Sequence, residues 1–421
     1  MTHPLQTPPA PASRPWNITA HGNVMTMSVM LVVVFLLAAC WYVAASDGIV
    51  DPSGRHAIGR DFINLWTAGR LVLDGRAATV FDVDGFHAVQ ESIVGREFPL
   101  HLWSYPPHFL LMVAPLGLLG YLGALVLWSV VTVALYAVAA GYPRPATMAF
   151  LAAAPATLVN IGCGQTGALA AAFLFAGLRL MHTRPAFSGI LFGLLTVKPQ
   201  LGLLVPLVLL VERRWTVIAW AGLTTLALAA LSAVIFGPEL WSVYLRQNFA
   251  VTRSYLEVGT GPFMDMVPST FMALRRQGVS LEIAYAVQAV VAVLVAIGAV
   301  LVWRSAAPRD FKVALTGIAA LLATPYAHNY DMTVISLGVL AGYTLVGADT
   351  AVWRRACLTL IWLLPIAMVP LHHVGITIAP LLLLGFYAWL VAQCKSVAAT
   401  EIEVANCDQK NFVASCRTSA V

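Results

Sequence analysis

Two adjacent residues of opposite charge, Arg60 and Asp61, follow the first apolar segment of the chain. They lie in the stretch 46–104, which is too polar to sit in lipid. A carboxylate there can take a proton from a hydroxyl, and a cation beside it can stabilise a developing anion or orient the carboxylate. The pair therefore predicts a transferase site at a membrane surface, with Asp61 as general base. The alternative is that Asp61 only caps the helix that begins there.

Further polar side chains recur where later apolar runs are interrupted. With Asn64 they form the predicted substrate cavity, namely Tyr105, His108, Asn160, Gln165, Gln200, Tyr326, Asn329, Tyr330 and Asp331. Ionisable groups at membrane depth are costly and are functional candidates. We expect Arg60, Lys198 and His328 to bind an anionic phosphate. The alternatives are that Lys198 reaches to a surface and that His328 and Asp331 are ordinary loop residues.

Composition points to a membrane protein. Charged residues make up 10% of the chain and hydrophobic residues 60%, whereas soluble domains contain about 25% charged residues. The apolar runs predict an all-α multi-spanning protein with about 10–13 transmembrane or partial helices. The net charge of +5 comes mostly from Arg at the ends of apolar runs, which sets topology and does not indicate nucleic acid. The cysteines are scattered without CxxC spacing, so a zinc site or disulfide framework is not expected.

The chain divides into a membrane domain and two tails. Residues 1–22 are rich in proline and predict a disordered cytoplasmic tail, as do the polar residues 395–421. Between them, 23–394 form the membrane domain, and its first run reads as an uncleaved anchor. Breaks at 162–164 and 198–200 predict broken helices around a polar cavity, because irregular backbone at that depth must line protein or water. The run 108–141 is expected to cross once, although its length also fits a hairpin.

Basic residues set the predicted topology. Connections flanked by arginine should face the cytoplasm, near residues 144, 179–184, 213–214, 304–312 and 354–355. The other connections then face outward, namely 46–105, 160–165, 198–200, 237–280, 324–331 and 372–375. The loop 237–280 alternates aromatic and charged residues, which is typical of an amphipathic helix at the interface.

Several short motifs occur in an order that resembles glycosyltransferase family 87, one of the C-type membrane glycosyltransferases. They are Arg60-Asp61-Phe62, Gly75, Val80-Phe81-Asp82, Tyr105-Pro106-Pro107, Gly164-Gln165, Lys198-Pro199-Gln200, Arg213-Arg214-Trp215, Thr324-Pro325-Tyr326 and Tyr330-Asp331. The resemblance extends over roughly residues 24–394.

The resemblance implies a donor such as polyprenyl-phosphate-mannose, a glycolipid or glycan acceptor, and an inverting transfer. It places the active site on the periplasmic or outer face of a bacterial inner membrane. No cofactor is expected, because a phosphate monoester leaves without a metal, although Asp61 with Asp331 or His328 could bind one. A transporter or lipid-sugar flippase is the alternative, and a transporter would place its polar groups at the membrane midplane. A non-catalytic assembly subunit would leave Asp61 and Lys198 unexplained.

Overall fold

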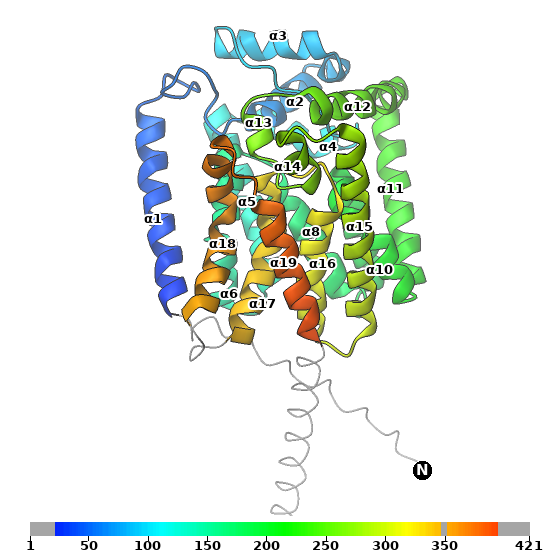
Figure 1. Cartoon of the computed structure of the whole chain (residues 1–421). Helices are drawn as coiled ribbons and strands as arrows, with labels where there is room; N and C mark the ends of the chain where they lie inside the picture. Colours follow the sequence, from blue (N-terminus) through cyan, green and yellow to red (C-terminus); the bar gives the residue numbers. More distant parts are fainter. Residues whose placement is uncertain (1–21, 347–351, 395–421) are drawn as a thin grey trace, which may run out of the picture.

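The computed structural model describes residues 22–346 and 352–394, and this part of the chain is helical without β-strands (Figure 1). The predicted tails lie outside the described residues, apart from Gly22. The helices are α1 (Gly22–Ala44), α2 (Phe62–Leu73), η2 (Ala77–Phe81), α3 (Val83–Val94), α4 (Phe109–Val113), η3 (Ala114–Leu118), α5 (Tyr121–Gly141), α6 (Pro145–Ala152), α7 (Pro155–Cys163), α8 (Gly167–Leu180), α9 (Pro185–Leu194), η4 (Leu195–Val197), η5 (Pro199–Gly202), α10 (Val205–Val211), α11 (Trp215–Phe236), α12 (Glu239–Val258), α13 (Pro262–Asp265), α14 (Thr270–Arg276), α15 (Leu281–Arg304), α16 (Arg309–Ala323), η6 (Asn329–Ile335), α17 (Ser336–Val346), α18 (Val352–His373) and α19 (Ala379–Ala392).

Long apolar helices and shorter ones share the bundle. In the described part of the chain, α1, α5, α11, α15 and α18 are each long and apolar enough to cross a membrane, and α6 with α7 could form one further span bent by 52°. Apolar helices of 10–17 residues stand between them, among them α8, α9 with η4, η5 with α10, and α19. The expected all-α multi-spanning architecture is therefore confirmed. The run 108–141 holds one long helix, α5, preceded by the short α4 and η3.

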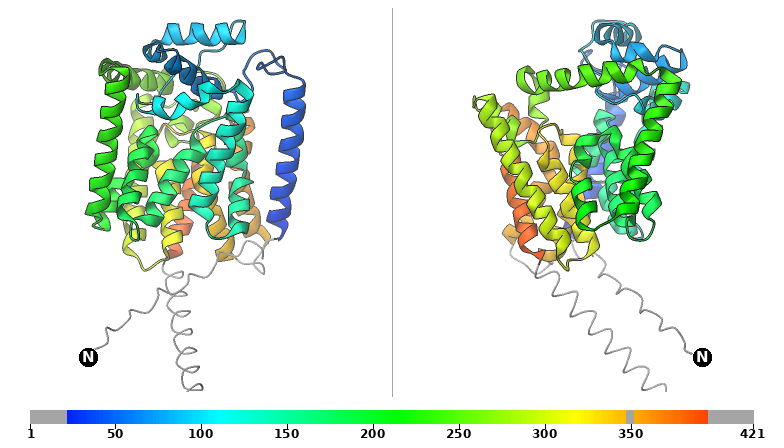
Figure 2. Two further views of the ribbon diagram at one scale, coloured as in Figure 1. Left: turned by 180° about the vertical axis from the view of Figure 1, so that it is seen from behind. Right: turned by 90° about the vertical axis from the view of Figure 1, so that its right-hand side faces the viewer.

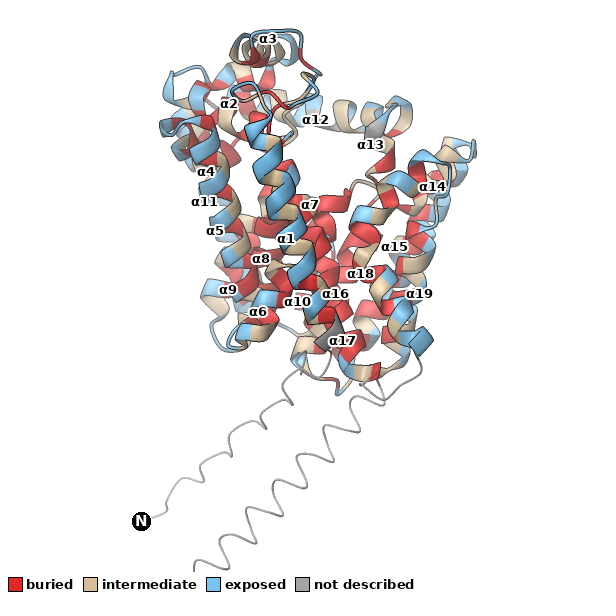
Figure 3. Ribbon diagram, turned by 90° about the vertical axis from the view of Figure 1, so that its left-hand side faces the viewer, coloured by how far each residue is buried: buried red, intermediate tan, exposed pale blue. Residues whose placement is uncertain are grey.

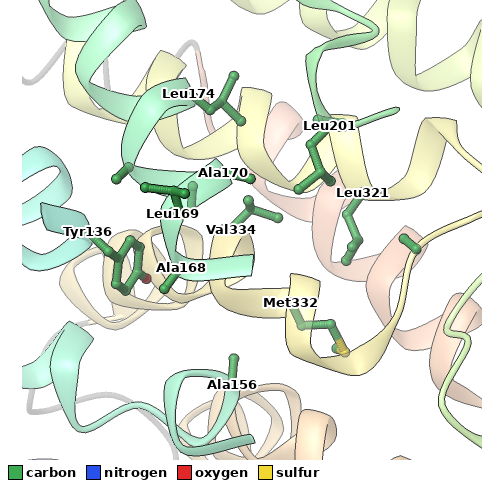
Figure 4. Close-up of a cluster of buried hydrophobic side chains, with 14 of the residues drawn as sticks. Tyr136, Ala156, Ala168, Leu169, Ala170, Leu174, Leu201, Leu321, Met332 and Val334 are labelled. Atoms are coloured by element: carbon green, nitrogen blue, oxygen red, sulfur yellow. The ribbon is translucent and has the colours of Figure 1, made fainter. Parts of the chain in front are cut away.

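The centre of the bundle is formed by α8 and α16, whose residues are almost all buried (Figure 3). Alanines on α8 let neighbouring helices approach closely, and the cluster in Figure 4 joins α8 to residues of η6 and α5. In this cluster the Tyr136 hydroxyl donates a hydrogen bond of 2.8 Å to the Thr333 carbonyl oxygen. By contrast, the most apolar windows of α1 and α11 are only 11% and 6% buried, as expected for helices surrounded by lipid.

The two ends of the bundle differ. At one end α2, α3 and α12 lie across the ends of the spanning helices, and α12 turns across the bundle where α11 ends (Figure 2). The helix predicted within 237–280 is thus present as α12. At the other end the basic connections gather, and Asp310 accepts ion pairs from Arg144 and Arg179, both at 2.8 Å. The two sets of connections predicted from charge therefore separate within the bundle.

Candidate active site

A tightly folded loop delivers Asp61 to the start of α2. The Asp51 carboxylate organises this loop by accepting hydrogen bonds from the Tyr42 hydroxyl at 2.8 Å and the Ser53 hydroxyl at 2.6 Å. Gly59 and Arg60 then take positive φ values of 75° and 43°, which reverse the chain just before the helix. A non-glycine residue in this left-handed region is uncommon, so the backbone around Arg60 is constrained by its surroundings.

The Asp61 carboxylate faces away from its own helix. It makes no side-chain capping hydrogen bond to α2, which argues against the simple capping role. Its Oδ2 instead accepts a hydrogen bond of 2.8 Å from Gln165 Nε2, contributed by the break between α7 and α8. No hydrogen bond to Oδ1 is found among the described residues, and the side chain keeps 28% of its surface exposed. Asp61 Oδ1 is therefore the oxygen available to a substrate.

Gln165 is itself fixed in orientation. Its Oε1 accepts hydrogen bonds from the Tyr105 hydroxyl at 2.8 Å and from the Thr166 backbone N–H at 3.1 Å. Both are donors, so the amide must present its N–H₂ group to Asp61. The Tyr105 hydroxyl also lies 3.1 Å from Thr166 Oγ1. The segment 164–167 thus binds the Asp61 carboxylate through Gln165 and contacts a second charged group through Thr166.

That second group is Lys198, which stands between η4 and η5. Its Nζ donates to Thr166 Oγ1 at 3.3 Å and forms an ion pair with Asp331 Oδ1 at 2.5 Å. The ammonium also lies 4.8 Å from the centre of the Tyr330 ring. Lys198 is only 4% exposed, so it does not reach to a surface as the alternative required. Its charge is balanced by Asp331, as burial demands.

Two glycines, Gly164 and Gly167, allow the segment between α7 and α8 to pack closely against neighbouring segments of the site. Gly164 has φ of +59°, and a Cβ there would lie 2.4 Å from Phe62 Cβ, next to Asp61. A Cβ on Gly167 would lie 2.2 Å from the Tyr330 carbonyl oxygen. Residues 59–62, 164–167 and 330–331, far apart in sequence, can therefore meet only because these positions carry no side chain.

One cavity of about 430 Å³ brings the predicted site together. Its lining includes the predicted residues Arg60, Asp61, Asn64, Tyr105, Gln165, Lys198, Gln200, Tyr326, His328 and Tyr330. All of the predicted outer connections except 372–375 thus contribute to this cavity, and residues of α12 and α13 form part of its wall. Among the described residues, Asp61 is the only carboxylate on this lining.

Some of the predicted cavity residues do not line this space. His108 is buried, stacks on Trp241 and lies 3.2 Å from the Thr196 hydroxyl through Nε2. Asn160 accepts a hydrogen bond from the Ala168 backbone at the start of α8, and Asn329 donates to the Pro365 carbonyl oxygen. Asp331 is fully buried behind Lys198. Polarity alone suggested a place in the cavity for these residues, whereas the geometry gives them contacts within the helix framework.

The predicted phosphate ligands differ in charge. His328 stacks on Tyr330 at 4.9 Å, and burial together with Lys198 lowers its pKa to about 3. The neutral ring can donate one hydrogen bond but adds no charge. Arg60 is exposed and makes no ion pair within the described part of the chain. Of the described residues on the cavity lining, Arg60 is therefore the cation left free for an anion, and Lys198 is a second cation whose charge is balanced by Asp331.

Sequence reasoning missed several lining residues, above all His101, His56 and Phe263. His101 Nε2 lies 3.7 Å from Asp61 Oδ1. Burial, followed by the effect of Arg60, lowers the pKa of His56. Sequence reasoning relied on charged pairs and on polar residues at helix breaks. An isolated histidine in a polar loop, such as His101, matches neither pattern. The described residues contain no group of three potential metal ligands.

Comparison with known proteins now identifies the family. A model of glycosyltransferase family 87 matches residues 103–325, more than half of the chain. This range includes Tyr105, Gln165 and Lys198, whereas Asp61, His328 and Asp331 lie outside it, so their assignment depends on geometry. No curated protein matches, and no solved structure matches. The match over most of the bundle, joined to a polar cavity in an apolar helical protein, shows that the chain belongs to glycosyltransferase family 87.

Proposed function

We propose that this membrane glycosyltransferase moves a mannosyl group from a polyprenyl-phosphate donor to a glycolipid or glycan acceptor. The reaction would take place at the outer face of a bacterial inner membrane. The observation that carries the proposal is the shared cavity, whose lining among the described residues includes a single carboxylate, Asp61, and a cation without an ion pair, Arg60. A donor with a phosphate on an apolar tail suits a site that opens at the end of an apolar bundle.

In the proposed reaction, Asp61 Oδ1 takes the proton of the acceptor hydroxyl as the acceptor oxygen bonds to the anomeric carbon. The bond from that carbon to the phosphate oxygen breaks, and its electron pair leaves on the polyprenyl phosphate. Arg60 and Lys198 would stabilise the growing phosphate charge, and His328 would donate a hydrogen bond. Holding Oδ2, Gln165 keeps Oδ1 directed at the acceptor.

The lining also favours inversion at the anomeric carbon. A retaining route by double displacement needs a second carboxylate as nucleophile, about 5–5.5 Å from the first. Of the described carboxylates, only Asp61 lines the cavity, and Asp331 is covered by Lys198. A single displacement with one base fits this arrangement and yields the inverted anomer.

Donor class is tested with the purified protein and a set of synthetic donors. Polyprenyl-phosphate-mannose is compared with polyprenyl-phosphate-glucose and with nucleotide sugars, and the released polyprenyl phosphate or nucleotide is measured. We expect turnover with the lipid-linked mannose alone. Turnover with a nucleotide sugar and none with either lipid-linked donor would contradict the proposal. The acceptor is sought by mass spectrometry of envelope glycans from a deletion strain, as a product lacking one hexose.

A further inference from the structure

His101 stands beside the proposed base without a place in the reaction described so far. Its ring lines the cavity, and its Nε2 lies 3.7 Å from Asp61 Oδ1, the oxygen that Gln165 leaves free. The side chain is 13% exposed, so the ring is held against the protein while one edge reaches the cavity. It comes from the loop after α3, far from the predicted motifs.

Local contacts determine which ring nitrogen carries the proton. His101 Nδ1 lies 2.6 Å from the Pro99 carbonyl oxygen. A carbonyl oxygen only accepts, so Nδ1 must be the donor. In the neutral ring the lone pair is then on Nε2, directed toward Asp61. The ring also stacks on Phe98, with centres 5.0 Å apart and planes inclined by 21°, which holds this orientation.

The arrangement sets two proton acceptors face to face. At 3.7 Å they are not hydrogen-bonded, but a proton placed on Asp61 Oδ1 would give a donor on one side and a lone pair on the other. Such contacts are often long before substrate binds and shorten in the reacting complex. A proton can then pass from Asp61 to His101, and the resulting imidazolium would be stabilised by the restored carboxylate.

We propose that His101 is the proton relay of this site. The acceptor hydroxyl gives its proton to Asp61 Oδ1, Asp61 passes it to His101 Nε2, and His101 releases it to solvent, which leaves Asp61 ionised for the next turnover. The proposal depends on the function proposed above for Asp61. His101 acts on the reaction through Asp61, so it is a positioning and relay residue and not the base itself.

Other titratable groups around His101 could influence its behaviour. Arg60 and His56 face it from the loop before α2, and Tyr244 approaches from α12. Of these, His56 offers the matched control, because it lines the same cavity and is not paired with Asp61 in the described structure. An effect of His101 that His56 does not share would therefore concern Asp61 and not the polarity of the cavity.

The test compares His101→Gln, His101→Asn and His56→Gln with Asp61→Asn, all purified and assayed with the lipid-linked donor over a range of pH. Asn can still donate to the Pro99 carbonyl oxygen from the position of Nδ1, but it has no counterpart of Nε2. General acid–base groups contribute about 10²–10⁴-fold, and a relay that acts through the base should cost about 10–100-fold in kcat. We expect that loss in both His101 variants, with little change in KM for the donor, a displaced acidic limb in the pH profile and partial recovery with added imidazole.

Each outcome separates the two claims. If Asp61→Asn abolishes turnover while both His101 variants keep the wild-type kcat and pH profile, the relay is wrong and the base assignment stands. Activity retained by His101→Asn but lost in His101→Gln would also overturn the relay. It would mean that His101 matters only for its hydrogen bond to the Pro99 carbonyl oxygen. If Asp61→Asn keeps wild-type turnover, the assignment of Asp61 as the base fails and the relay fails with it. If the wild-type protein shows no turnover with the lipid-linked donor, the proposed function itself fails. Thermal midpoints of all variants in detergent exclude unfolding as the cause of a loss.

Discussion

At the scale of single residues, the site combines a polarised carboxylate with a buried ion pair. Asp61 has one oxygen held by Gln165 and the other directed into the cavity. Lys198 supplies positive charge but is balanced by Asp331 at 2.5 Å. The hydrogen bonds through Tyr105 and Thr166 connect the two. The proposed base Asp61 and the proposed phosphate ligand Lys198 therefore belong to one hydrogen-bond network. A substitution at either residue should alter the position or charge environment of the other.

Replacement of Lys198 should reduce both turnover and stability. Lys198→Met removes charge that favours the leaving phosphate, and losing one such stabilising group typically costs about 10²–10³-fold in rate. It also leaves the buried Asp331 carboxylate without its ion-pair partner, which typically costs about 3–5 kcal/mol of stability. Turnover and the thermal midpoint are measured on the same preparation. Lys198→Arg should recover part of the rate, because a planar guanidinium does not reproduce a point charge.

A double variant separates the two effects. Lys198→Met with Asp331→Asn removes both charges, so the thermal midpoint should rise back toward that of the wild type. If Lys198 serves the donor phosphate, turnover stays low in the double variant. Restored turnover together with restored stability would mean that Lys198 only supports the fold.

At the scale of elements, the break between α7 and α8 joins the parts of the site. The sequence predicted this break, the break at Lys198 and the amphipathic helix in 237–280, because glycine, proline and charge pattern act locally. It also predicted that polar side chains at these breaks would meet. It could not predict the Lys198–Asp331 ion pair, whose members are 133 residues apart. Nor could it predict that His108, Asn160 and Asn329 contact neighbouring helices and do not line the cavity. Those outcomes depend on helix packing, which no local pattern encodes.

Substitution at Gly167 tests this junction. A Cβ there would meet the Tyr330 backbone at 2.2 Å, and overpacking of a close contact typically costs about 1–3 kcal/mol. Gly167→Ala should therefore lower the thermal midpoint in detergent and reduce turnover. Gly162→Ala is the control, since its nearest neighbour is a ring atom of Phe35 at 3.9 Å and alanine favours the helix. Equal midpoints for the two variants would show that the close approach is not needed.

At the scale of the whole molecule, the bundle has a cavity end and a basic end. Family membership and the apolar helices establish a multi-pass membrane glycosyltransferase. Composition and hydropathy were enough to predict this architecture, because a low charge content leaves few other options. The side of the membrane faced by each end stays a prediction from the arginine pattern.

Orientation can be tested by labelling. Ser254 lies exposed on α12 at the cavity end, and Ala306 lies exposed in the connection between α15 and α16 at the basic end. We expect Ser254→Cys to react with an impermeant thiol reagent in intact cells and Ala306→Cys to react only after lysis. Cys40 and Cys357 are exposed and must first be replaced to remove background. The opposite labelling pattern would place the cavity on the cytoplasmic side.

The most direct measurement is the turnover of Asp61→Asn with polyprenyl-phosphate-mannose as donor, followed as released polyprenyl phosphate. Asparagine keeps the size of the side chain and can still accept the hydrogen bond from Gln165, but it cannot take a proton from the acceptor. The loss of a general base should lower kcat by about 10²–10⁴-fold, with the thermal midpoint of the wild type retained. Wild-type turnover by this variant would contradict the assignment of Asp61 as the base.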